Sequence, residues 1–226
     1  MRGRQLKAIV LGLLKQTDFR ASLEMLTQLP AKQVVNPLFA SFCNSDERVR
    51  HRGVTAMGVV VAELAKTDRE AARIIMRRHM WTLNDESGGI GWGAPEAMAE
   101  IMVRDERMAL EYSLMLVSYL DEDGNFLEYE VLQRGLLWGL ARLASARWGL
   151  LRHAGPLLEK YLDSRDATVR GFGALNIGLL NVGPAEPKLR SMLGDRAPVR
   201  YYWDDMLTET SAGDLVREAL GRLEGT

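Results

Sequence analysis

The sequence contains little cysteine, histidine or proline: one Cys, three His and seven Pro in 226 residues. A single cysteine excludes an internal disulfide and a metal site built from several cysteines. Because Cys43 follows the apolar residues Leu38, Phe39 and Phe42, we expect a buried structural thiol rather than a nucleophile. The three histidines (His51, His79 and His153) do not lie at a metal-ligand spacing from the central carboxylates. We therefore predict no bound metal or cofactor.

The sequence also has no excess of charge of either sign and no long apolar run. Its formal net charge is −1, which creates no overall field toward nucleic acid or an anionic membrane. Residues 53–65 are the longest apolar candidate, and Thr55 and Glu63 interrupt them. The N-terminus begins like a signal peptide, but Thr17–Arg20 stand where small residues would be needed for cleavage. We expect a cytoplasmic protein that does not bind a membrane or nucleic acid.

What the sequence does contain is a series of amphipathic helices with recognisable start signals. Residues 2–16 place apolar side chains on one face, which predicts a first helix. Asp18 is placed to cap a second helix, and Pro30 to start a third that runs to about Cys43. Asp46 precedes a fourth. With 47% hydrophobic residues, these helices can bury a core without disulfides or metals.

A pattern of small and apolar residues recurs along the chain. Gly53–Gly58 aligns with Ala94–Ala99 after a shift of 41 residues and with Gly135–Leu140 after another 41. The next copy, Gly173–Gly178, follows after 38 residues. A period of this size with two helices per unit predicts an α-solenoid, whose neighbouring repeats share one core. We expect the small residues to allow close helix packing.

The starts of three of these units resemble the HEAT-repeat (armadillo-type) family, in the short form found in the HEAT-like repeats of bilin lyases. The residues that carry the resemblance are Asp46-Glu-Arg-Val-Arg50, Asp166-Ala-Thr-Val-Arg170 and Asp195-Arg-Ala-Pro-Val-Arg200. The second and third units lack the Val-Arg pair. We expect the repeated Asp and Arg to form a ladder of ion pairs along the stack.

The resemblance implies an all-α fold, an α-α superhelix (HEAT-like solenoid) of about five helical-hairpin repeats with helical caps. We expect one domain over residues 1–226, with an N-terminal cap of about 1–29, repeats of about 30–207 and a capping helix of about 212–224. In this scheme Tyr201, Tyr202 and Trp203 fall on the last inner helix, where Tyr202 or Trp203 could serve as a binding anchor.

The regular pattern breaks between Trp81 and Glu100. Residues 84–93 form a glycine-rich loop, and Pro95 restarts a helix. The loop has no Walker lysine and no preceding strand, so we do not expect phosphate binding. The stretch also looks like that of small HEAT-like proteins of unassigned activity from anaerobic, sulfate-reducing bacteria. Trp92 either plugs the edge of the solenoid or offers an exposed aromatic platform.

Four carboxylates accompany this loop, and two of them lie four residues apart on the helix that follows (Asp85, Glu86, Glu96 and Glu100). We predict that Glu96 and Glu100 face solvent or an arginine of the next repeat, with Arg134 as the natural partner. Carboxylate pairs can also perform acid/base chemistry or hold a divalent metal.

These observations favour a non-enzymatic scaffold or adaptor that binds another protein through its concave face and the 81–100 loop (Trp81, Asp85, Glu86, Trp92, Glu96 and Arg134). One alternative is a small enzyme or metal-dependent protein that uses the four carboxylates. A second is suggested by Trp81 and Asp85, which resemble the tryptophan and carboxylate of HEAT-like alkylpurine DNA glycosylases. The absence of a basic stripe argues against that alternative.

Overall fold

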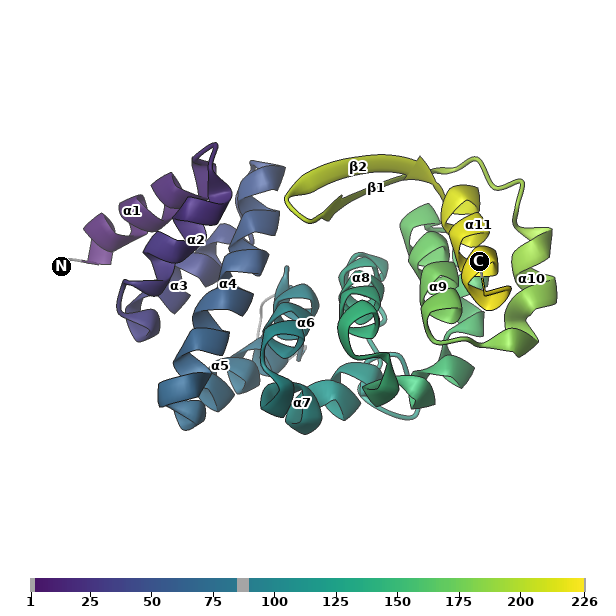
Figure 1. The fold of residues 1–226 in the computed structure, drawn as a ribbon, viewed down its shortest axis with the longest axis horizontal. Coiled ribbons are helices and arrows are strands. Elements are labelled where there is room, and N and C mark those ends of the chain that lie inside the picture. Colours follow the sequence, from purple (N-terminus) through teal and green to yellow (C-terminus); the bar gives the residue numbers. More distant parts are fainter. Residues whose placement is uncertain (1–2, 85–89, 226) are drawn as a thin grey trace. The chain divides into compact units, whose positions relative to one another are not determined.

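The computed structural model describes residues 3–84 and 90–225, and the chain divides into two compact units, Met1–Ala109 and Leu110–Thr226. Helices dominate both units, as predicted (Figure 1). Asp85 and Glu86 lie outside the described residues. None of the helices within the described ranges combines the length and the apolar character that a bilayer crossing requires.

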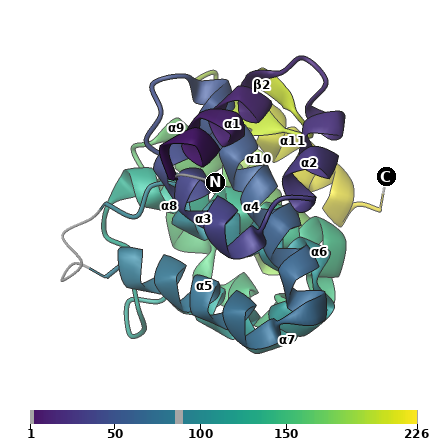
Figure 2. The same cartoon turned by 90° about the vertical axis from the view of Figure 1, so that its left-hand side faces the viewer.

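Within the described residues the first unit is helical, and its longest helix, α4 (Glu47–Thr67), lies at its centre. Its elements are α1 (Gly3–Lys15), α2 (Phe19–Thr27), α3 (Ala31–Ser41), α4 (Glu47–Thr67), α5 (Arg69–Thr82), α6 (Ala94–Arg104) and the first turn of α7 (Glu106–Ser118). Helix α4 contacts α3, α5 and α6, and the four helices are labelled in Figure 2. Fully buried Leu38, Met57, Met76 and Met98 form part of the core between these helices.

The helix starts predicted from the sequence are confirmed. Asp18 caps α2 and Asp46 caps α4 through hydrogen bonds accepted from backbone N–H groups of the first turn. Arg50 then reaches back from the first turn of α4 and donates to the backbone carbonyls of Asn44 (2.8 Å) and Ser45 (3.3 Å). Cap and arginine together form a closed local structure, which we call the Asp–Arg clasp.

The predicted close packing of helices at glycine is present in both units. A Cβ atom on Gly58 of α4 would lie 2.8 Å from the backbone carbonyl of Glu100 in α6. In the second unit, a Cβ atom on Gly178 would lie 2.5 Å from the Cα of Ala219. Only glycine allows two backbones to approach this closely.

The burial predicted for Cys43 is wrong, since this residue is exposed. Helix α3 ends at Ser41, and its buried face runs through Val34, Leu38 and Phe42 at intervals of four residues. Cys43 follows Phe42 in the turn, beyond the last position of that face. An apolar neighbourhood in sequence therefore did not place the thiol in the core.

The second unit is built around α9 and contains short 3₁₀ segments as well as helices. Its elements are the rest of α7, α8 (Glu130–Arg147), η2 (Trp148–Leu150), η3 (Arg152–Leu157), η4 (Glu159–Asp163), α9 (Ala167–Leu179), η5 (Gly183–Ala185), α10 (Glu186–Ser191), β1 (Pro198–Trp203), β2 (Met206–Ser211) and α11 (Ala212–Leu223). Helix α9 contacts α8, η4, β1 and α11. The C-terminal helix begins with a capping box of Ser211 and Asp214.

The inner helix predicted for the last repeat is wrong: residues 198–211 form an antiparallel β-hairpin, β1–β2. In the other two copies valine follows the capping aspartate by three residues, but Val199 follows Asp195 by four. Pro198 also biases Ala197 away from helical geometry. The residues that follow are aromatic and β-branched, which suits an extended strand.

The predicted Asp–Arg ladder is confirmed at two places in the second unit. Arg134 Nε donates to Asp166 Oδ2 (2.7 Å), and Arg170 Nε donates to Asp195 Oδ2 (2.9 Å). Asp166 also caps α9, and Arg170 donates to the carbonyls of Ser164 and Arg165. The clasp of α4 is thus repeated at α9. Arg200, expected to continue this pattern, lies instead on β1 opposite Glu209.

Candidate functional site

The residues proposed from the sequence fall into different environments. Trp81, at the end of α5, is 59% exposed, and Trp92, in the loop before α6, is 37% exposed. Both indoles can therefore contact a partner, although Trp92 also interacts within the chain. Asp85 and Glu86 lie outside the described residues. Within the described ranges, no three His, Cys, Asp or Glu side chains gather as a metal ion would require.

Glu96 is half-buried, so the predicted exposure to solvent is only partial. Its Oε2 atom is completely buried and accepts no hydrogen bond from any described residue. Burial disfavours the charged form and raises the pKa of this carboxyl to about 7, against a small opposing effect of its own backbone N–H. Trp92 lies one helical turn before it in sequence. The first unit thus contains, at the start of α6, a carboxyl with one buried oxygen that has no hydrogen-bond partner among the described residues.

Glu100 is also buried, and its partner is not the one expected. It forms an ion pair with Arg104 of the same helix, and Arg104 Nη1 also donates to the Glu100 backbone carbonyl (3.0 Å). The predicted role of Arg134 as the partner of these carboxylates is wrong, because Arg134 pairs with Asp166. Glu100 is thus paired within its own helix, and Arg134 is paired within the Asp–Arg ladder.

His79 is a fully buried polar residue that the sequence analysis does not predict as part of a site. Neither ring nitrogen has a hydrogen-bond partner among the described residues, and burial, followed by the charge of Arg78, lowers the pKa of the imidazole to about 3. The ring lies 4.3 Å from that of Phe39 and 6.0 Å from that of Phe42. Its spacing from Ala72, Ile75 and Met76 is a helical signal for burial that was available in the sequence.

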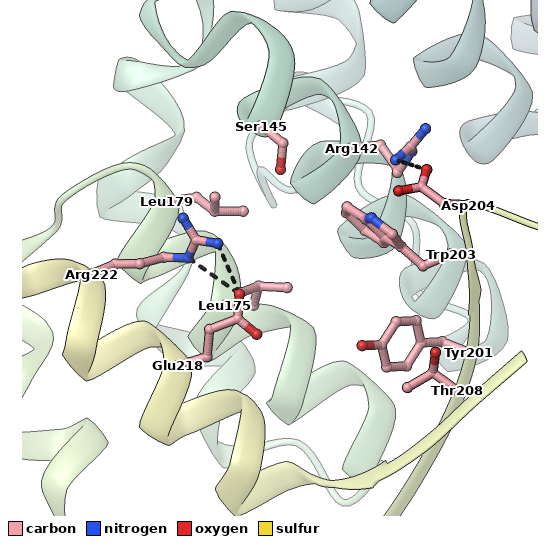
Figure 3. Close-up of a pocket in the computed structure, with 10 residues that line it drawn as sticks. All are labelled: Arg142, Ser145, Leu175, Leu179, Tyr201, Trp203, Asp204, Thr208, Glu218 and Arg222. Carbon is pink, nitrogen blue, oxygen red and sulfur yellow. Dashed lines mark hydrogen bonds and ion pairs between the residues drawn. The ribbon is translucent and has the colours of Figure 1, made fainter. Parts of the chain in front are cut away.

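The second unit contains a pocket of about 500 Å³ between the β-hairpin and helices α8, α9 and α11 (Figure 3). Leu175 and Leu179 of α9 provide apolar lining. Figure 3 shows the rings of Tyr201 and Trp203, from β1, on one side of the pocket and the Glu218–Arg222 pair of α11 on the other. The remaining lining residues come from α8, the hairpin turn and β2 (Arg142, Ser145, Asp204 and Thr208).

Two ion pairs set the electrostatics of this pocket. Arg142 Nη1 donates to Asp204 Oδ1 (3.0 Å), and the guanidinium carbon of Arg142 lies 4.7 Å from the centre of the Trp203 ring. Arg222 donates twice to Glu218, and both hydrogen bonds end on Oε1. The pocket therefore combines an aromatic surface with two ion pairs whose charges balance.

A hydrogen bond, a ring contact and the hairpin turn hold the aromatic residues of the pocket, Tyr201 and Trp203, in place. Trp138 Nε1 of α8 donates to the carbonyl oxygen of Tyr202 (2.8 Å), and Trp138 and Trp203 meet edge to face at 5.9 Å. The hairpin turns at Asp204 and Asp205, whose φ angles of 48° and 63° match a type I′ turn. Burial raises the pKa of the Tyr201 phenol, and the nearby Glu218 carboxylate raises it further.

Among the pocket residues, only Trp203 is predicted from the sequence, as a possible binding anchor. The missed signal is the run Val199–Trp203 followed by two aspartates and a second run of β-forming residues. Repeat periodicity favoured a helix there. Once the hairpin is recognised, Tyr201 and Trp203 fall on one face, since alternate residues of a strand share a face.

Comparison with known proteins identifies the fold. No protein-family model matches the chain. An engineered protein aligns with 100% of this chain and 98% of its own length at a TM-score of 0.55 and 15% identity. A designed armadillo repeat protein aligns with 96% of this chain and 99% of its own length at a TM-score of 0.51 and 17% identity. The chain folds as an armadillo-type α-solenoid.

Two further relatives add information about this fold. Another designed armadillo repeat protein, solved in complex with the peptide (KR)4, aligns with 96% of this chain and 99% of its own length at a TM-score of 0.50 and 18% identity. A protein of Archaeoglobus fulgidus is 26% identical over 178 residues, which cover 76% of this chain and 88% of that protein, and its description states no function. These likenesses establish the architecture, and the chemistry must be argued from the residues of this chain.

Proposed function

We propose that this chain is a non-enzymatic HEAT-like scaffold of the cytoplasm that binds a peptide segment of another protein. The pocket beneath the hairpin carries this proposal, because it combines two aromatic side chains with exposed charged groups in one concave site. Aromatic residues dominate the energetics of protein interfaces, and paired charges on the rim add orientation. A designed protein of the same architecture binds the peptide (KR)4, which supports peptide binding as a use of this fold.

Trp81 and Trp92 form a second proposed contact surface in the first unit. Both indoles are partly exposed, and Trp81 has most of its surface available to a partner. Truncation of Trp81 to alanine removes an exposed side chain and should leave the fold unchanged. Asp85 and Glu86, which lie outside the described residues, stay predictions as members of this surface.

The proposal can be tested by selecting binding peptides from a random twelve-residue library displayed on phage. Selected peptides are synthesised and titrated calorimetrically against the wild type and Glu218→Gln. We expect the substitution to weaken binding by roughly tenfold, since it removes a charge from the wall of the pocket. Glu186→Gln is the matched control, because Glu186 forms a similar exposed pair with an arginine four residues away, on α10, outside the pocket.

Two outcomes contradict the proposal in different ways. Equal affinity for the wild type and Glu218→Gln means that the selected peptides bind elsewhere. The Trp81→Ala variant then shows whether the first unit is the binding surface. If the library yields no peptide that binds in solution, the peptide-binding function itself is wrong.

Glu96 supports a second candidate function, that of a general acid or base. A carboxyl group whose pKa lies near 7 is suited to proton transfer at neutral pH. Catalysis requires that a small molecule reach the carboxyl. Treatment of the folded protein with a water-soluble carbodiimide and glycine ethyl ester, followed by mass spectrometry, measures this access. An unmodified Glu96 in the native protein would exclude it as a catalytic group.

A further inference from the structure

The two edges of the β-hairpin differ in their capacity to pair with another strand. On β1, the outward carbonyl of Tyr202 already accepts a hydrogen bond from Trp138, and Pro198 has no N–H to donate. Helix α9 also contacts β1, which lies on the helix side of the hairpin in Figure 1. An additional strand cannot pair with this edge.

The outer edge of β2 presents unused backbone groups. Trp203 and Met206 flank the two-residue turn, so they form the first hydrogen-bonded pair of the hairpin. The next pair, Tyr202 and Leu207, is therefore not hydrogen-bonded within the hairpin, and the same holds for Arg200 and Glu209. The N–H and C=O groups of Leu207 and Glu209 point away from β1. Within the described ranges, these groups have no hydrogen bond to a backbone outside the hairpin.

Proteins usually protect such an edge with proline, charged side chains or a bulge. Strand β2 (MLTETS) contains no proline, its register with β1 is unbroken, and Glu209 is its single charged residue. It exposes apolar side chains instead: Met206 is 68% exposed and Leu207 is 40% exposed. An open edge with exposed apolar residues indicates a binding surface for another extended chain.

We propose that β2 binds an extended segment of the partner protein, which adds to the hairpin as a third strand. This inference rests on the proposed peptide-binding function and adds a second surface to it, because Leu207 and Glu209 are not among the residues that line the pocket. The bound segment would exchange backbone hydrogen bonds with Leu207 and Glu209, place an apolar residue beside Leu207 and place a basic residue beside Glu209. Glu209 can accept this basic residue, because its ion pair with Arg200 is long (3.8 Å) and both side chains are exposed.

A second copy of the same chain is the competing occupant of this edge. Two β2 strands related by a twofold axis through Thr208 would place Leu207 of one copy opposite Glu209 of the other. That arrangement sets an apolar side chain against a carboxylate and supplies no cation. Charge complementarity therefore favours a basic and apolar peptide over self-association.

The test uses as its probe an acetylated octapeptide in which valine and lysine alternate at every second position, with threonine between them. Valine and lysine two residues apart can then lie beside Leu207 and Glu209, which share one face of β2. Amide hydrogen exchange in the full chain is measured by NMR with and without the peptide. We expect exchange to slow at least tenfold at Leu207 and Glu209, the residues whose N–H groups point outward. Met206 and Thr208, whose N–H groups already bond to β1, should change little. The reversed-charge peptide, with glutamate in place of each lysine, should bind at least tenfold more weakly.

Two perturbations separate strand addition from simple charge attraction. Methylation of alternate backbone nitrogens in the probe removes hydrogen-bond donors but keeps every side-chain charge, and should abolish binding. Glu209→Lys should weaken binding at least tenfold, whereas the control Glu186→Gln should not change it. Circular dichroism of each variant verifies that the fold is retained.

The following results would overturn the inference that β2 binds an extended segment. If the lysine–valine peptide does not bind, or binds without slowing exchange at Leu207 and Glu209, strand addition is wrong. In that case the library-selected peptides decide separately whether the proposed peptide-binding function survives. Protection that grows with protein concentration in the absence of peptide, together with a dimer in sedimentation velocity, would identify a second copy as the occupant.

Discussion

The buried carboxyl of Glu96 makes the stability of this protein depend on pH in a specific direction. Its pKa is about 7 in the folded chain and 4.5 in an exposed glutamate. Between these values the folded state holds a proton that the unfolded state has released. The resulting stabilisation is complete below about pH 4.5 and is lost as pH rises through about 7. Since one pKa unit corresponds to about 1.4 kcal/mol, the free energy of unfolding should fall by roughly 3 kcal/mol across this range.

Glu96→Gln removes this titration while keeping the size of the side chain. Urea unfolding followed by circular dichroism, from about pH 5 to about pH 8, measures the difference between variant and wild type. We expect that difference to grow with pH, until the variant is more stable by roughly 3 kcal/mol at the alkaline end. Glu24→Gln, on the exposed surface of α2, controls for the loss of a carboxylate. A difference for Glu96→Gln that stays constant with pH would refute the assignment of a raised pKa.

Three further predictions concern stability, each measured by urea or thermal unfolding. His79→Phe should stabilise the protein by about 1–3 kcal/mol because it removes two unpaired ring nitrogens. Its advantage should increase as pH falls below 6.5, where the unfolded wild type gains a proton; an advantage that shrinks in acid would contradict this. Asp166→Asn should cost about 0.5–1 kcal/mol, since it keeps the helix cap and loses the Arg134 ion pair, whereas Asp166→Ala should cost about 1 kcal/mol more. Gly178→Ala should destabilise by about 2 kcal/mol through its clash with the α11 backbone, while Gly12→Ala, which meets nothing within 4 Å, should stabilise α1 by up to about 1 kcal/mol.

The helical part of the fold could be predicted because its determinants are local. Capping residues such as Asp18 and Asp46 act within one turn of their own helix, and apolar periodicity identifies the buried face without knowledge of its partner. The hairpin could not be predicted in the same way. At residues 195–203, one inserted position and one proline outweighed the repeat pattern, and sequence similarity to earlier copies concealed that change.

The candidate site was harder to predict than the fold because its properties depend on tertiary contacts. The spacing of Glu96 and Glu100 correctly places both on one helix, yet the two groups differ: Glu100 has Arg104 as a partner, and Glu96 Oε2 has none among the described residues. Arg134 was assigned a role from repeat alignment, whereas its partner, Asp166, lies 32 residues away in sequence. Pairing of charges is decided by packing between helices, which periodicity does not encode.

The Asp–Arg clasp has a consequence for the order of events during folding. All its hydrogen bonds join residues no more than six positions apart, at both Asp46–Arg50 and Asp166–Arg170. Such contacts close very short loops, so they cost little chain entropy and can form before any distant segment arrives. Helix initiation is the unfavourable step in helix formation. Each clasp therefore stabilises the first turn of its helix. We expect α4 and α9 to form first in their respective units.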